Sequence, residues 1–162
     1  QKGMHVLWES LVPEAQLKNY TLFYPKVPEY IAKPQDFIFQ ILLESHEMLP
    51  EMFKAETEVR KALGEDKSFK MVERYGKMQR YYTDEFIQTY GDKLGSSIPN
   101  RMIQSSHRVA SFWYSAWKDA GSPVWVAKEI SADKKAAFEA EKAIWRSNTL
   151  ISTGQLISLH KK

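Results

Sequence analysis

The sequence predicts an all-α fold, a multi-helix bundle of about five helices with a proline-rich extended connector. Apolar residues recur at spacings of three and four over long stretches, and proline and glycine separate these stretches. No stretch alternates apolar and polar residues for long enough to require a sheet. At 162 residues and 43% hydrophobic content the chain has the size of one domain with a substantial core. We therefore expect residues 1–162 to form a single helical domain.

The first expected helix is short, from His5 to about Leu11, and Pro13 should stop it. Residues 19–34 follow, with Pro25, Pro28 and Pro34 placed among aromatic residues. Closely spaced prolines cannot continue a helix. This part of the chain is expected to be an extended connector packed against the helices.

Two helices are expected after Pro34. The first carries an apolar stripe at helical spacing, formed by Phe37, Ile38, Ile41, Leu42, Ser45, Met48 and Leu49. Pro50 then bends the chain or opens the second helix at its first turn. The second helix continues an apolar face with Met52, Phe53, Glu56, Val59 and Leu63, and Gly64 should end it.

The clearest periodicity predicts an amphipathic helix from Ser68 to about Tyr90. Its apolar face repeats at three and four residues through Met71, Tyr75, Met78, Tyr82, Phe86 and Tyr90. The region from Gly91 to Gly95 should break this helix.

Another helix is predicted from Pro99 to Ala120, ended by Gly121-Ser122-Pro123. Its expected buried stripe is Met102, Ser106, Val109, Ala110, Trp113, Ala116 and Trp117. Trp113, Tyr114 and Trp117 are interpreted as core aromatics rather than as a base-stacking platform. Ser131 should cap a last helix that runs to about Trp145. Thr149 to Lys162 have no clear period and are expected to pack loosely or fray.

Composition excludes several function classes. The absence of cysteine excludes disulfides, thiolate zinc sites and a cysteine nucleophile. Net charge is only +3 and the basic residues are dispersed, which is weak evidence for nucleic-acid binding. No stretch approaches the roughly 20 apolar residues of a membrane span, so no integral membrane segment is expected. The chain starts at Gln1 rather than at a methionine, which suggests that an upstream segment has been removed.

One pair of residues has the spacing of a metal site. On a helix His5 and Glu9 are one turn apart, so an imidazole and a carboxylate share a face and could bind one zinc ion. Zinc usually needs three or four ligands, so the site is incomplete in this chain. The alternative is an ordinary surface pair. We interpret His46 and His107 as structural and His160 as a solvated residue of the tail.

The segment Gly3-Met4-His5-Val6-Leu7-Trp8-Glu9-Ser10, followed by Val12-Pro13-Glu14, resembles a known motif. It is similar to the Asn-Leu-His-x-x-Trp-Asp stretch of the zinc-dependent phospholipase C and single-strand (S-one/P-one type) nuclease superfamily. The helix from Arg101 to Ala120, with Phe112-Trp113-Tyr114-Ser115-Ala116-Trp117, is similar to the last helix of bacterial members. The likeness covers most of residues 3–123 and leaves residues 124–162 uncovered.

The resemblance implies a largely helical fold in which a zinc cluster activates water to cleave phosphodiester bonds. It implies that His5 and Glu9 bind one zinc, that the chain is the C-terminal part of a longer hydrolase, and that this part alone is inactive or very weak. The remaining ligands would come from the missing N-terminal segment. Substrates would be nucleic acid or phospholipid, and the location secreted or periplasmic. No catalytic residue is assigned.

Two departures from the motif keep an alternative open. Glu9 stands where the motif has aspartate, and Gly3 stands where it has asparagine. These favour a non-catalytic helical scaffold or interaction module derived from that family. A third possibility is nucleic-acid binding without catalysis, which the dispersed basic residues disfavour.

Overall fold

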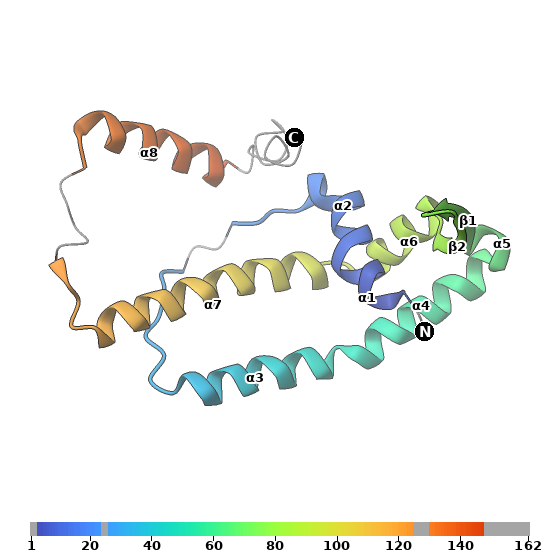
Figure 1. The fold of residues 1–162 in the computed structure, drawn as a ribbon, viewed down its shortest axis with the longest axis horizontal. Helices are drawn as coiled ribbons and strands as arrows, with labels where there is room; N and C mark the ends of the chain where they lie inside the picture. The colour runs from blue at the N-terminus through green and yellow to red at the C-terminus, as the bar shows by residue number, and fades with distance from the viewer. Residues whose placement is uncertain (1–2, 24–25, 125–129, 148–162) are drawn as a thin grey trace. The chain divides into compact units, whose positions relative to one another are not determined.

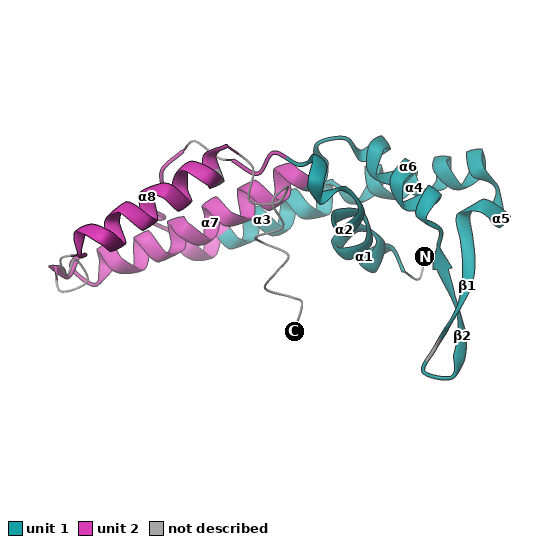
Figure 2. Ribbon diagram, turned by 90° about the horizontal axis from the view of Figure 1, so that it is seen from above, with its two compact units in different colours: residues 1–20, 38–98 teal, residues 21–37, 99–162 magenta. Residues whose placement is uncertain are grey.

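The computed structural model describes residues 3–23, 26–124 and 130–147. The chain is mostly helical, with one two-stranded antiparallel sheet, so the prediction of a purely α fold was wrong (Figure 1). Its contacts divide it into two compact units (Figure 2). Unit 1 comprises residues 1–20 and 38–98, and unit 2 comprises residues 21–37 and 99–162. Pro25, the expected fraying from Thr149 to Lys162, and His160 lie outside the described residues.

Unit 1 begins with a helical stretch that Pro13 does not stop. It consists of α1 (Met4–Val6), the π-helical turn η1 (Leu7–Leu11), α2 (Val12–Gln16) and the 3₁₀ turn η2 (Leu17–Asn19). Pro13 lies in the first turn of α2, directly after the wider π turn. A proline is tolerated there because its missing N–H is not needed for a hydrogen bond.

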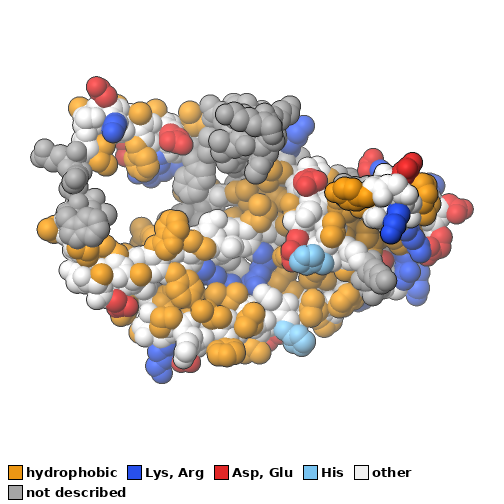
Figure 3. All heavy atoms as spheres, in the orientation of Figure 1, with side chains coloured by type: hydrophobic (Ala, Val, Ile, Leu, Met, Phe, Trp, Pro, Cys, Tyr) orange, Lys and Arg blue, Asp and Glu red, His pale blue; other side chains and the backbone are white. Residues whose placement is uncertain are grey.

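The two helices predicted after Pro34 are present, as α3 (Pro34–Glu47) and α4 (Leu49–Leu63). In α4 the residues Ala55, Glu56 and Val59 are buried. None of the residues of α3 is buried, and its apolar side chains are visible at the surface along the helix (Figure 3). Leu42 and Leu43 are each 57% exposed.

The helix predicted from Ser68 to Tyr90 was wrong. The short helix α5 (Glu65–Ser68) leads into β1 (Phe69–Arg74), which pairs antiparallel with β2 (Lys77–Tyr82). A two-residue turn, Tyr75-Gly76, joins the strands, and both residues have positive φ angles of 53° and 70°. Such a turn matches the twist of a hairpin. Beyond the hairpin, α6 (Asp84–Leu94) is helical, and it ends inside the predicted Gly91–Gly95 break, with Gly95 as its C-cap.

The core of unit 1 forms where α6 packs against the N-terminal helical stretch and α4. Thr83 caps α6 by accepting a hydrogen bond from the Phe86 amide at 3.1 Å. Aromatic rings stack in series along the hairpin base and α6, with centroid separations of 4.6 Å for Tyr82–Phe86 and 6.2 Å for Phe86–Tyr90. The other buried apolar residues include Met4, Leu7, Val12, Ala55, Val59, Ile87, Leu94 and Ile98.

Unit 2 contains α7 (Ser97–Asp119, from Pro99 onward) and α8 (Ala132–Arg146), close to the predicted ranges. Residues 26–33 of the predicted connector contain no helix or strand, and their backbone is hydrogen-bonded to α7. The amide of Glu29 donates to Ser111 Oγ at 3.1 Å, and the amide of Ile31 donates to Ser115 Oγ at 2.8 Å.

The predicted buried stripe of α7 was wrong. Ser111 and Ser115 are buried, whereas Trp113 is 75% exposed and Trp117 is also exposed. The N–H groups of the connector backbone need hydrogen-bond acceptors, and the serine hydroxyls provide them. Because serine is small, it also lets the connector lie close to α7. The buried face of α7 is therefore the small polar one, and the aromatic cluster is not core.

Candidate functional site

The structure brings His5 and Glu9 together as an exposed pair. Their side chains contact each other, with His5 Nδ1 3.1 Å from Glu9 Oε1. His5 is 79% exposed and Glu9 is 51% exposed. The helical spacing therefore places an imidazole and a carboxylate on one accessible face. In this arrangement the Nε2 atom of His5 is the ring nitrogen that is not engaged by Glu9.

The helix is irregular at this pair. His5 lies in α1, whereas Glu9 lies in the π-helical turn η1. Single π turns inside helices are rare and frequently occur at functional sites. Gly3, which precedes α1, has a φ angle of 100°. A residue with a side chain would be strained at this φ angle.

Trp8 lies beside the pair in sequence, three residues after His5. Its indole Nε1 is buried and has no hydrogen-bond partner among the described residues. Buried donors are almost always paired, so an unpaired one calls for an acceptor that the described chain does not supply.

The described residues contain no group of three or more histidine, aspartate or glutamate side chains that could hold a metal ion. Imidazole and carboxylate are suitable zinc ligands, and they are accessible here. The pair therefore fits zinc in chemistry but supplies only two of the ligands that a zinc site needs.

A pocket of about 790 Å³ lies in unit 1, and neither His5 nor Glu9 is among its lining residues. Its walls come from that stretch, from α4 and from the hairpin. Gly3, Val6 and Leu11 line it from the first, Glu56 and Arg60 from the second, and Phe69 with residues 79–82 from the third.

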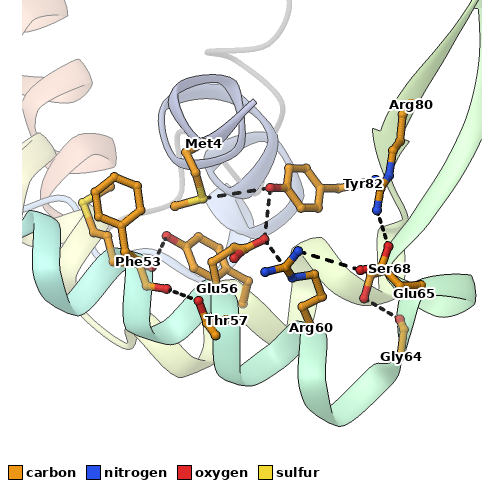
Figure 4. Close-up of polar contacts among 12 residues, drawn as sticks. Met4, Phe53, Glu56, Thr57, Arg60, Gly64, Glu65, Ser68, Arg80 and Tyr82 are labelled. Carbon is orange, nitrogen blue, oxygen red and sulfur yellow. Dashed lines mark hydrogen bonds and ion pairs between the residues drawn. The ribbon is translucent and has the colours of Figure 1, made fainter. Parts of the chain in front are cut away.

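The polar centre of the pocket wall is the buried carboxylate of Glu56, which is 2% exposed. The Tyr82 hydroxyl donates to Glu56 Oε1 at 3.4 Å and lies 3.9 Å from the sulfur of Met4 (Figure 4). Burial, reinforced by the Glu56 carboxylate, raises the pKa of Tyr82 to about 12. Tyr82 is therefore a neutral donor across the physiological range.

Two arginines at the pocket are held by acids of the same unit. Arg60 Nε lies 3.7 Å from Glu56 Oε1, and Arg60 also pairs with Glu65 at 3.7 Å. Arg80 pairs with Glu65 and stacks over the Phe69 ring, with its guanidinium carbon 3.5 Å from the ring centroid. These contacts join α4, α5 and the hairpin, so we assign the network a structural role.

The other histidines that can be located have different surroundings. His46 is exposed on α3, and His107 Nε2 lies 2.9 Å from the carbonyl oxygen of Val27 in unit 2. The Val27 contact gives His107 a structural role. The pocket could not be predicted from the sequence analysis, because half of its lining residues belong to the hairpin and that segment was predicted to be helical. The Tyr75-Gly76 dipeptide was the signal that could have found it.

None of the described helices is long and apolar enough to cross a membrane. No protein-family model, no curated protein and no solved structure matches this chain.

Proposed function

We propose that this chain is part of a zinc-dependent phosphodiester hydrolase to which it contributes one pair of metal ligands, His5 and Glu9. The single observation that carries the proposal is their geometry, since an imidazole and a carboxylate meet at 3.1 Å on one accessible helical face. The resemblance of residues 3–14 to the zinc phospholipase and nuclease motif supports the same assignment.

The irregular backbone and the indole of Trp8 also support it. The π turn at Glu9 and the unpaired buried Nε1 of Trp8 both occur within one helical turn of His5. The remaining zinc ligands would lie outside the described residues.

The roles of the two residues follow from their chemistry. His5 would bind through Nε2, because Nδ1 faces Glu9. Glu9 would either bind directly or fix the orientation of the imidazole through the Nδ1 hydrogen bond. When bound, zinc supplies Lewis-acid activation of a water molecule for attack on phosphorus. Two ligands are too few for firm binding, so the 162-residue chain alone is expected to be inactive or very weak.

Elemental analysis of the complete product of the encoding gene tests the proposal. Zinc should copurify with the protein and should be lost in His5→Ala and Glu9→Ala. His46→Ala is the matched control, because His46 is an exposed histidine on another helix, and it should retain zinc. Zinc-dependent hydrolysis of bis(4-nitrophenyl) phosphate should be lost in the same two variants. Unchanged zinc content in His5→Ala would contradict the assignment.

A second candidate function is a helical interaction module without metal chemistry. One observation favours it: α3 has no buried residue, and its apolar side chains Ile38, Phe39, Leu42 and Leu43 are largely exposed. Exposed apolar surface on one helix is typical of a partner-binding face. A complete gene product that contains no zinc and hydrolyses no phosphodiester would favour this second function.

A further inference from the structure

Helices α3 and α4 carry apolar side chains on two different faces. One face contains Ile41, Met48 and Met52, which are half-buried. The other face is exposed, and we call its apolar side chains the outer stripe: Ile38, Phe39, Leu42, Leu43, Leu49 and Phe53. A helix at the surface of a protein ordinarily has one apolar face. A second apolar face that is exposed to solvent indicates a second packing partner.

The outer stripe is continuous because the chain stays helical between α3 and α4. Met48 joins the two helices with φ and ψ angles of −77° and −22°, and the Met52 amide donates to the Met48 carbonyl oxygen at 3.1 Å. The stripe residues follow one another at spacings of three and four, which places them on one side of the helices. They all belong to unit 1. The stripe can therefore pack along another helix.

The arrangement of the outer stripe is symmetric about His46, which is exposed on the same side. Phe39 and Phe53 lie seven residues before and after His46, and Leu43 and Leu49 lie three residues before and after it. If two copies pack antiparallel at His46, each phenylalanine lies at the level of a phenylalanine and each leucine at the level of a leucine. Such self-complementarity is what a two-fold interface requires, because the same surface serves both copies.

The area of the outer stripe is sufficient for a weak dimer. Its six apolar side chains are 37% to 64% exposed. These fractions correspond to three fully exposed side chains, which is roughly 600 Å² per copy at about 200 Å² for each large side chain. A specific interface needs about 1,000 Å² in total. Two stripes together provide roughly 1,200 Å², which is above that limit and below the standard size of about 1,600 Å².

The charges near the outer stripe disfavour anionic partners. Residues 34–53 contain four acidic residues and no lysine or arginine. An anionic lipid surface or a nucleic acid would be repelled by these carboxylates and would find no cation to pair with. The stripe residues themselves carry no carboxylate, so two copies can pack without burying one.

We propose that the chain forms a homodimer in which the outer stripes of two copies pack antiparallel, with His46 of both copies at the two-fold axis. There one imidazole donates a hydrogen bond to the other. A polar side chain within an apolar helix pair fixes the register, because a shift would place it against apolar side chains. The proposal names a second copy as the partner of the face on which the second candidate function rests. It does not depend on zinc at His5 and Glu9.

Sedimentation equilibrium of the 162-residue chain in EDTA tests the dimer, because chelation removes any contribution of a metal. An interface of this area should give a dissociation constant on the order of 10 μM, so the chain should be mainly dimeric at about 100 μM and monomeric below about 1 μM. Leu42→Ser/Leu43→Ser should raise the dissociation constant at least tenfold, since it removes apolar area from both copies. His46→Leu should lower the constant about tenfold, because it replaces a buried polar side chain with an apolar one.

The matched control is Met71→Ser/Met78→Ser on the hairpin. Met71 and Met78 are 58% and 60% exposed, close to the 57% of Leu42 and Leu43. The hairpin and α3 lie at opposite ends of α4 (Figure 1). The control should therefore leave the dissociation constant unchanged. Circular dichroism of each variant shows that the helices are intact.

Disulfide cross-linking tests the orientation of the two copies. The chain has no cysteine, so a single cysteine reports one position. His46→Cys should form a disulfide-linked dimer on oxidation. Phe39→Cys alone should not, because its two copies lie roughly 20 Å apart in the antiparallel dimer. A mixture of Phe39→Cys and Phe53→Cys should cross-link.

Three results would overturn the proposal. The first is a chain that stays monomeric at about 100 μM, where the expected dimer is the main species. The second is an unchanged dissociation constant in Leu42→Ser/Leu43→Ser, and the third is cross-linking of Phe39→Cys to itself. A monomeric chain that cosediments with phosphatidylcholine vesicles, and loses this binding in Leu42→Ser/Leu43→Ser, would assign the outer stripe to a lipid surface instead.

Discussion

The side-chain amide of Gln16 lies directly against Gly91, where a Cβ atom would come within 2.6 Å of it. Gln16 is buried, and its Nε2 donates to Asp92 Oδ1 at 2.7 Å and to the carbonyl oxygen of Gln88 at 3.2 Å. Gly91 therefore allows α2 and α6 to approach closely at the point where the Gln16 side chain links them by hydrogen bonds. This contact explains why a glycine that ordinarily disfavours helix lies within α6.

Substituting Gly91→Ala should destabilise the protein. The added methyl group displaces the Gln16 amide from its hydrogen bonds, and we expect the free energy of unfolding to fall by about 1–3 kcal/mol. Urea denaturation measures this change. In the background of Gln16→Ala the same substitution should cost much less, because the obstructing amide is gone. An equal cost in both backgrounds would show that Gln16 is not the obstacle.

Stability should decline at alkaline pH because of Tyr82. Its pKa of about 12 in the folded protein exceeds the ordinary value of 10, so the unfolded chain releases this proton first as pH rises. The stabilising contribution is complete below pH 10 and is lost between pH 10 and about 12, with a total of about 2–3 kcal/mol. Burial also raises the pKa of Tyr90, which acts in the same direction.

The variant Tyr82→Phe isolates that contribution. Between pH 10 and 11.5, its free energy of unfolding should fall less steeply than that of the wild-type protein. Below pH 9 it should be about 1 kcal/mol less stable, because it lacks the hydroxyl that donates to Glu56. Tyr81→Phe is the control, since Tyr81 lies on the opposite face of the hairpin. Parallel pH profiles for wild type and Tyr82→Phe would rule out the assignment to Tyr82.

In unit 2, Ser115→Ala should loosen the extended connector. The Ile31 amide donates to Ser115 Oγ in a buried position, and removing that acceptor leaves a buried donor without its partner. The expected cost is about 1–3 kcal/mol. Hydrogen exchange at the Ile31 amide should become faster by tenfold or more. Ser106→Ala is the control, because Ser106 is exposed and its hydroxyl donates to the carbonyl of Met102 on its own helix. Unchanged exchange at Ile31 in Ser115→Ala would contradict the role of this hydrogen bond.

Local signals in the sequence predicted most of the helices. Pro34, Pro50 and Gly64 delimit α3 and α4 close to their observed bounds, because proline favours a first turn and glycine an end. The hairpin was not predicted, because the spacing of its apolar residues also fits a helix. Met71, Tyr75, Met78 and Tyr82 fit a helical period, yet the same residues lie on two strands once the chain reverses at Tyr75-Gly76. The chain reversal is signalled by two residues, Tyr75 and Gly76, whereas the apparent helical spacing extends over more than twenty residues. The longer pattern therefore led to the wrong prediction.

The buried face of α7 and the pocket depend on long-range contacts that no local pattern contains. Ser111 and Ser115 are buried because the connector's backbone lies on them, some 80 residues away in sequence. Likewise Glu56, expected on an apolar face of α4, is buried as a carboxylate because Tyr82 of the hairpin and Arg60 meet it there. By contrast, His5 and Glu9 contact each other as their spacing predicted, because a separation of one turn is fixed by the helix itself.

Replacing Tyr75 should change the stability of the hairpin. Asparagine tolerates the left-handed conformation and is preferred before glycine in this turn, so Tyr75→Asn should raise the free energy of unfolding by about 0.5–1 kcal/mol. Tyr75→Phe is the matched control, because it keeps both the ring and the strained backbone, and it should leave the free energy of unfolding unchanged. Urea denaturation of the two variants measures the change. A Tyr75→Asn protein no more stable than the wild type would show that the positive φ angle at Tyr75 costs no stability.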